Sequence, residues 1–116
     1  MSKQTVLIIG SIWVEPNSSA AGSRMLQLIS QFLQQHWNVT FASAAVKGEK
    51  AMDLKPIGVD EAAIELNQSS FDIFIKELAP TIVLFDRFMI EEQFGWRVAE
   101  NCPNALRILD TEDLHC

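Results

Sequence analysis

The run Thr5–Gly10 (TVLIIG) decides the fold class of this chain. An unbroken series of β-branched and apolar residues of strand length, closed by a glycine, is typical of a strand that is buried on both faces. Thr81–Phe85 (TIVLF) repeats the pattern and stops at Asp86. Strands of this kind occur almost only in parallel sheets between helix layers, so the two runs predict the centre of such a sheet.

Helical periodicity fills the sequence between and after these runs. Apolar residues recur at helical spacing in three segments, which we expect to form amphipathic helices: Met25, Leu26, Ile29, Phe32, Leu33 and Trp37; Phe71, Phe74, Ile75 and Leu78; and Ile90, Phe94, Val98 and Cys102. Ser69 or Ser70 is expected to cap the start of the second helix, and Pro80 to lie beyond its end.

Further strands are predicted at Asn38–Ser43, Ala62–Leu66 and Ala105–Leu109. The segment Ala44–Gly58 shows no periodicity and is predicted to be an exposed connection. Strands that alternate with helices imply right-handed crossovers between parallel strands. The sequence therefore predicts the α/β class, as a three-layer Rossmann-like domain with a mostly parallel sheet.

Length and charge limit the function classes. The chain has 116 residues, enough for one hydrophobic core and too few for two domains. Its net charge of −6 is poorly suited to a phosphate backbone, which disfavours nucleic acid as a partner. Cys102 and Cys116 are too few to staple a small fold, and no apolar stretch approaches the ~20 residues that span a bilayer. We therefore expect a cytoplasmic protein without an integral membrane segment.

Residues that follow strands are the first candidates for a site, because ligands of open parallel sheets bind beyond the carboxyl ends of the strands. Asp86 follows a wholly apolar strand, and a carboxylate there needs a bonded partner to be tolerated. Arg87 stands next to it. One interpretation is a functional acid with Arg87 as its partner, and the other is a helix cap by Asp86 beside an exposed Arg87.

The segment from Ser11 to Ser23 (SIWVEPNSSAAGS) is expected to join the first strand to a helix through a loop of small residues. Its backbone N–H groups could approach a phosphate or an acidic sugar at the positive end of the helix. The alternative is that Ala20, Ala21 and Gly22 only permit close packing of helix and sheet. The segment has neither G-x-G-x-x-G nor G-K-[ST], which disfavours dinucleotide binding and Walker-type hydrolysis.

The C-terminal residues Asp110, Glu112, Asp113 and His115 form the densest group of ionisable side chains in the sequence. They could hold a divalent metal, although a defined further ligand is lacking. His115 or Asp113 could act as a general base, and the acids could instead cap a following helix. No serine or cysteine stands on a nucleophile elbow, so a nucleophilic triad is disfavoured.

Three stretches of the chain together resemble the opening of a family 4 glycosyltransferase of the GT-B fold. Val6–Ser43 has the family's order of strand, small-residue loop and helix, with the turn HWNVT at residues 36–40. Ala79–Phe88 is similar to the family segment P-D-I-V-h-F-D-R-F, and Leu109–His115 is similar to Y-D-T-x-D-L-H. The order and spacing of these motifs span nearly the whole chain.

This resemblance implies that residues 1–116 are the N-terminal, acceptor-side half of an enzyme that transfers a sugar from a nucleotide-sugar donor without a metal or other cofactor. Donor binding would belong mainly to a C-terminal half, so we expect the chain to be truncated and inactive alone. Ala21 departs from the pattern, because the family has the first glycine of its phosphate loop there. The resemblance places site residues as follows: candidate catalytic residues Asp86, Asp110, Asp113 and His115, and candidate substrate contacts Ser11, Gly22, Ser23, Arg24 and Arg87.

A second hypothesis is a non-catalytic ligand-binding or signalling domain of flavodoxin-like or receiver-like type. A receiver would need clustered acids after its first strand, an aspartate after its third strand and a late lysine. Glu15 is the only acid near the first of these positions, and the loop with Lys50 and Lys55 does not match the last. The residues therefore favour the glycosyltransferase half.

Overall fold

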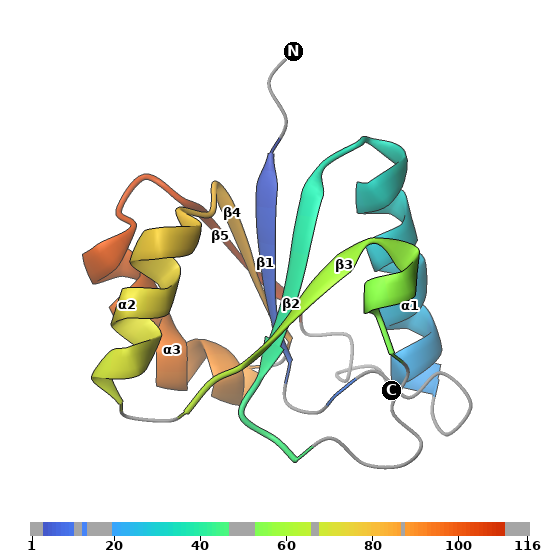
Figure 1. Ribbon diagram of the computed structural model, residues 1–116. Helices are drawn as coiled ribbons and strands as arrows, with labels where there is room; N and C mark the ends of the chain where they lie inside the picture. Colours follow the sequence, from blue (N-terminus) through green and yellow to red (C-terminus); the bar gives the residue numbers. More distant parts are fainter. Residues whose placement is uncertain are drawn as a thin grey trace.

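The computed structural model describes residues 4–10, 13, 20–46, 53–65, 68–86 and 88–110. Strands and helices alternate along these residues, so the expected α/β class is confirmed (Figure 1). The elements are β1 (Thr5–Gly10), α1 (Ala20–Gln34), β2 (Asn38–Ser43), the short 3-10 helix η1 (Lys55–Ile57), β3 (Val59–Ala63), α2 (Ser69–Leu78), β4 (Ile82–Asp86), α3 (Phe88–Asn101) and β5 (Leu106–Asp110).

The strands form one five-stranded sheet in the order β3-β2-β1-β4-β5. Every neighbouring pair in it is parallel. The chain first moves from β1 to β2 and β3 on one side, and then crosses to β4 and β5 on the other side. This reversal makes the gap between the carboxyl ends of β1 and β4 the switch point, where ligands of open α/β sheets bind.

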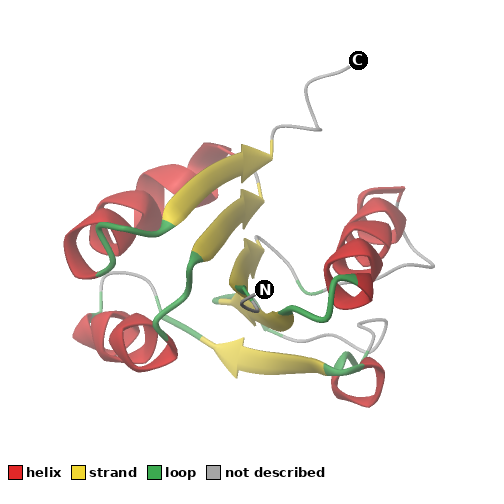
Figure 2. Ribbon diagram, turned by 90° about the horizontal axis from the view of Figure 1, so that it is seen from above, coloured by secondary structure: helices red, strands yellow, loops and turns green. Residues whose placement is uncertain are grey.

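Two helix layers cover the sheet (Figure 2). Successive residues of β1 serve opposite faces: Val6 and Ile8 pack in a cluster with α1, and Leu7 and Ile9 pack in a cluster with α2 and α3. This is the alternation of a pleated strand, and it explains why the run Thr5–Gly10 has no polar side. The expected three-layer Rossmann-like arrangement is therefore confirmed.

β3 begins earlier than the sequence suggested. It spans Val59–Ala63, not Ala62–Leu66, and Val59 pairs with Val39 of β2. As an edge strand, β3 can carry an exposed Asp60 that a central strand could not. The predicted strand was therefore placed about three residues too late because the acids of VDEAA hide it from a search for apolar runs.

We expected Ala44–Gly58 to be an exposed connection. The segment directly before β3 is partly buried instead. Leu54 is fully buried in the cluster under α1. Its backbone N–H donates a hydrogen bond of 2.8 Å to Oε2 of Glu61. This contact fixes the start of η1 against β3, so one residue of the connection anchors it to the core.

The start of α2 also differs from the expectation, because Gln68 occupies the N-cap position and makes no side-chain capping bond. Ser69 and Ser70 lie inside the first turn, so neither is the cap. The other end follows the expected pattern. Ala79 adopts the left-handed conformation with φ of 50°, its N–H donates to the carbonyl of Ile75, and Pro80 follows.

Replacing Ala79 by glycine is expected to stabilise the domain by about 0.5–1 kcal/mol, because glycine has no Cβ to oppose the left-handed backbone. Urea denaturation followed by circular dichroism measures this change. Ala63→Gly, at an exposed position of the extended strand β3, is the matched control and is expected to destabilise the domain. Lower stability in Ala79→Gly would contradict the left-handed end of α2.

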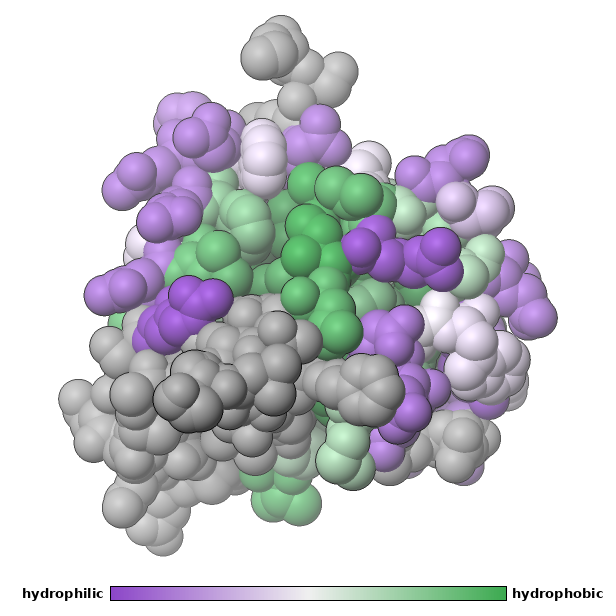
Figure 3. All heavy atoms as spheres, turned by 180° about the vertical axis from the view of Figure 1, so that it is seen from behind, coloured by the Kyte–Doolittle hydropathy of each residue, from purple (hydrophilic) through white to green (hydrophobic). Residues whose placement is uncertain are grey.

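β5 is the second edge of the sheet and carries no acid between its ends. Its side chains Leu106, Ile108 and Leu109 are all substantially exposed. β4 and β5 lie at the rear of Figure 1, and Figure 3 shows the molecule from that side. Apolar residues form a band at the centre of this face. Within the described residues, no helix is both long and apolar enough to cross a membrane.

Candidate functional site

The carboxyl edge of the sheet brings two acids together. Asp86 is the last residue of β4 and Asp110 is the last residue of β5. The two are direct register partners in neighbouring parallel strands, which lie about 4.8 Å apart in a sheet. Asp86 is half-buried. The sequence placed both acids after strands, and the structure makes them neighbours.

Asp86 also lies beside the switch point. Ile9 of β1 pairs with Phe85 of β4, so the next step along the two strands brings Gly10 level with Asp86. Gly10 in turn pairs with Ser43 at the end of β2. The carboxyl edge therefore presents a glycine at its centre, with a buried hydroxyl residue on one side and the two acids on the other. Carboxylates in such a place can accept hydrogen bonds from substrate hydroxyls or take a proton from one of them.

Trp13 and Ser43 shape the other half of this edge. Trp13 is buried, its Nε1 donates a hydrogen bond of 2.8 Å to the carbonyl of Ala45, and its ring lies 5.7 Å from that of Phe41. Oγ of the buried Ser43 accepts a hydrogen bond of 3.1 Å from the N–H of Ala45. These bonds tie Trp13, which follows β1, to the turn after β2.

Sequence reasoning named neither Trp13 nor Ser43 as part of the site. Trp13 was treated only as part of a loop of small residues, although a tryptophan in such a loop is itself a signal of burial with a hydrogen-bonded N–H. Ser43 was counted as the end of a strand. Both act by holding backbone in place, which a search for ionisable residues does not detect.

The loop after β1 was expected to run from Ser11 to Ser23. This is wrong for residues 20–23, because helix α1 already begins at Ala20. Gly22 and Ser23 lie in the first turn of α1, and Arg24 is exposed in the same helix. The first turn of a helix still offers free N–H groups and a positive dipole end, which suit an anion.

Four of the predicted site residues lie outside the described residues: Ser11, Arg87, Asp113 and His115. Asp86 is the last residue of β4 and stands two positions before α3, which begins at Phe88. The described part of the chain contains no group of three or more His, Cys, Asp or Glu residues that could hold a metal ion.

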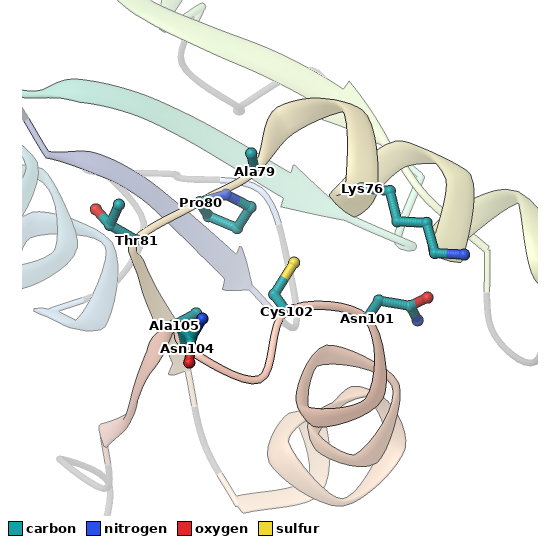
Figure 4. Close-up of a pocket in the computed structure, with 8 residues that line it drawn as sticks. All are labelled: Lys76, Ala79, Pro80, Thr81, Asn101, Cys102, Asn104 and Ala105. Carbon is teal, nitrogen blue, oxygen red and sulfur yellow. The ribbon is translucent and has the colours of Figure 1, made fainter.

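A separate pocket of about 290 Å³ opens at the opposite, amino edge of the sheet (Figure 4). The segments around the starts of β4 and β5 and the ends of α2 and α3 line it: Lys76, Ala79, Pro80, Thr81, Asn101, Cys102, Asn104 and Ala105. The thiol of Cys102 donates to the carbonyl of Ile75 at 3.6 Å. Burial raises the pKa of the Cys102 thiol, so the thiol stays protonated at neutral pH and is a weak nucleophile.

Comparisons with known proteins give no information about the function of the site. No family model matches the sequence, and no curated protein matches it. One solved structure, described as "Crystal structure of uncharacterized protein", is similar over 96% of this chain and 92% of that chain, with 20% sequence identity and a TM-score of 0.40. A likeness at that level carries no argument about function.

Proposed function

We propose that this chain is the acceptor-side half of a glycosyltransferase that uses a nucleotide-sugar donor. The observation that carries the proposal is the pairing of Asp86 with Asp110 at the carboxyl edge, beside the switch point between β1 and β4. Transfer of a sugar to a hydroxyl needs a group that orients this hydroxyl and accepts its proton. A pair of adjacent carboxylates supplies one acceptor for the proton and one for the orienting hydrogen bond.

The donor phosphates would approach the start of α1 in this proposal. Helices that cross between parallel strands run opposite to them, so α1 begins at the carboxyl edge, where β1 ends. Gly22 and Ser23 in its first turn would contribute backbone N–H groups, and the exposed Arg24 would contribute a positive charge. The remaining predicted contacts, Ser11 and Arg87, and the predicted catalytic residues Asp113 and His115, belong to the same proposal.

The strand order supports this proposal over the flavodoxin-like or receiver-like alternative. Domains of those types have the order 2-1-3-4-5, in which the third strand returns to lie beside the first. Here β3 is the edge strand beyond β2, and β4 lies beside β1. An order of 3-2-1-4-5 is that of nucleotide-binding Rossmann-like sheets.

Titration of the isotope-labelled chain with a panel of nucleotide sugars, followed by amide chemical shifts, tests the proposal. We expect shifts at the carboxyl edge, at Gly10, Ser43, Asp86 and Asp110, and none at the amino edge. The double variant Asp86→Asn/Asp110→Asn is expected to lose most of the response to the sugar. Glu100→Gln, an exposed acid near the end of α3, is the matched control and should leave the response unchanged.

Two outcomes would contradict the proposal. Shifts confined to the amino-edge pocket would remove the carboxyl edge as a nucleotide-sugar site. Turnover of a donor by the chain alone would contradict the expectation that catalysis needs a second, donor-binding half. The turnover assay uses the same donor panel and measures the released nucleoside diphosphate.

A further inference from the structure

The amino-edge pocket of Figure 4 is a second candidate for ligand binding, separate from the carboxyl edge. Four segments of the chain meet around it: the end of α2, the start of β4, the end of α3 and the turn before β5. Its volume of about 290 Å³ is close to the lower limit of pockets that hold small molecules, which is about 300 Å³. The volume therefore restricts the occupant to a small molecule.

Several of the residues that line the pocket are apolar. Pro80 is buried, and Cys102 and Ala105 are half-buried. The thiol of Cys102 already donates to the carbonyl of Ile75 at 3.6 Å, so its sulfur acts towards a ligand as a small hydrophobic group. In the view of Figure 4 this sulfur lies between the ring of Pro80 and the side chain of Lys76. These walls favour a ligand with an apolar body.

Two of the polar side chains that line the pocket have no proton left to donate. The hydroxyl of Thr81 donates its proton to Oε1 of Gln4 at 2.7 Å. The amide of Asn101 donates to Oδ1 of Asp72 at 3.0 Å and to the carbonyl of Arg97 at 2.8 Å, which uses both of its protons. A ligand therefore has to find its hydrogen-bond donors elsewhere in the pocket.

Lys76 and Asn104 are the donors that remain. Both are exposed, and neither side chain has a hydrogen-bond or ion-pair partner among the residues that the structure describes. Lys76 is also the only charged residue of those that line the pocket. Its ammonium group supplies three protons and a full positive charge, which suit a carboxylate. Asn104 lies on the other side of the pocket in Figure 4, so Lys76 determines where a charged group would bind.

We propose that the amino-edge pocket binds a small monocarboxylate with an apolar body. The carboxylate would pair with Lys76, and the body would lie against Pro80, Cys102 and Ala105. A single carboxylate is favoured over a phosphate or a dicarboxylate, because the carboxyl ends of α2 and α3 add partial negative charge here and one lysine opposes it. This site lies at the opposite edge of the sheet from the proposed nucleotide-sugar site and does not depend on it.

Titration of the isotope-labelled chain with benzoate and with benzamide, followed by amide chemical shifts, tests the charge. The two probes have almost the same shape, and only benzoate is an anion. We expect benzoate to bind about fivefold more tightly, the upper range for an exposed ion pair. Lys76→Met keeps an apolar side chain and should remove this preference while benzamide still binds. Lys55→Met, at an exposed lysine of η1 outside the pocket, is the matched control and should keep it.

Alkylation of Cys102 tests where the ligand lies. Iodoacetamide modifies thiols, and mass spectrometry of the peptides separates Cys102 from Cys116. Because the thiol of Cys102 lines the pocket, saturating benzoate is expected to slow its modification several-fold in the parent chain. The same concentration of benzoate should protect Cys102 less in Lys76→Met.

Several results would overturn the inference. They are equal affinities for benzoate and benzamide, no shift with either probe, an equal loss of the preference in Lys55→Met, and unchanged alkylation of Cys102 at saturating benzoate. Tighter binding of phenyl phosphate than of benzoate would also overturn it, since the ligand would then not be a monocarboxylate. If nucleotide sugars leave the carboxyl edge unchanged while Cys102 is still protected by benzoate, the proposed function fails and the amino-edge site remains.

Discussion

Replacing Phe94 by alanine is expected to lower the free energy of unfolding by about 4 kcal/mol, the largest effect of any single change considered. Phe94 is buried at the centre of the cluster between the sheet and the helices α2 and α3. Its ring lies 4.7 Å from that of Phe71 on α2, in a tilted arrangement that adds to the energy of burial. Three terms contribute to this loss of stability: the free energy of transferring the ring from water to the core, the cavity that the ring leaves behind, and the lost contact with Phe71.

The free energy of unfolding of a domain of this size is about 5–15 kcal/mol, so Phe94→Ala would remove a large part of it. Urea unfolding monitored by far-UV circular dichroism gives the free energy for the variant and the parent chain. Phe94→Leu keeps most of the volume and is expected to cost less than half as much. Met89→Ala, at an exposed position of the same helix, should stay within about 0.5 kcal/mol of the parent. A cost of less than about 1 kcal/mol for Phe94→Ala would contradict the packing of α3 on α2.

The central strands could be predicted from the sequence because only apolar side chains fit their buried environment. β1 and β4 are covered on both faces, so every position from Val6 to Ile9 must be apolar, and the run is visible without alignment. The third helix was visible for a similar reason, since Ile90, Phe94 and Val98 all face the core.

The edges of the sheet and its connections were harder to predict. An edge strand tolerates polar residues, so VDEAA of β3 has no alternation that separates it from a loop. Leu54 is a single buried residue in a polar segment, and one residue has no period. The amino end of α1 was missed because Ala20–Ser23 consists of small residues that fit a helix and a loop equally well.

The candidate site was predictable in its residues but not in its geometry. That Asp86 and Asp110 each close a strand follows from the two apolar runs before them. That they are neighbours depends on β4 and β5 being adjacent in the sheet, which is a property of the strand order. Local patterns do not encode strand order, because the same alternation of strands and helices is compatible with several sheets.

Removing the carboxylate of Asp72 is expected to be the second largest effect, a loss of about 2–3 kcal/mol for Asp72→Ala. Asp72 on α2 accepts two hydrogen bonds from α3: 2.8 Å from Nη1 of Arg97 and 3.0 Å from Nδ2 of Asn101. The side chains of Arg97 and Asp72 are only 13% and 26% exposed. Without the carboxylate, a largely buried guanidinium keeps its charge and loses its partner.

A double-mutant cycle separates the energy of the pair from the cost of leaving one charge alone. Nε of Arg97 is buried and has no hydrogen-bond partner, so the guanidinium already bears an uncompensated cost of burial. Arg97→Met in the Asp72→Ala background removes that cost together with the charge. We therefore expect the double variant to be more stable than Asp72→Ala and to lie within about 1 kcal/mol of the parent chain. Urea unfolding of the four chains, at low and at high salt, measures the coupling. Strict additivity of the two single losses would show that the pair between α2 and α3 contributes no energy of its own, and that Phe71 and Phe94 hold these helices together without it.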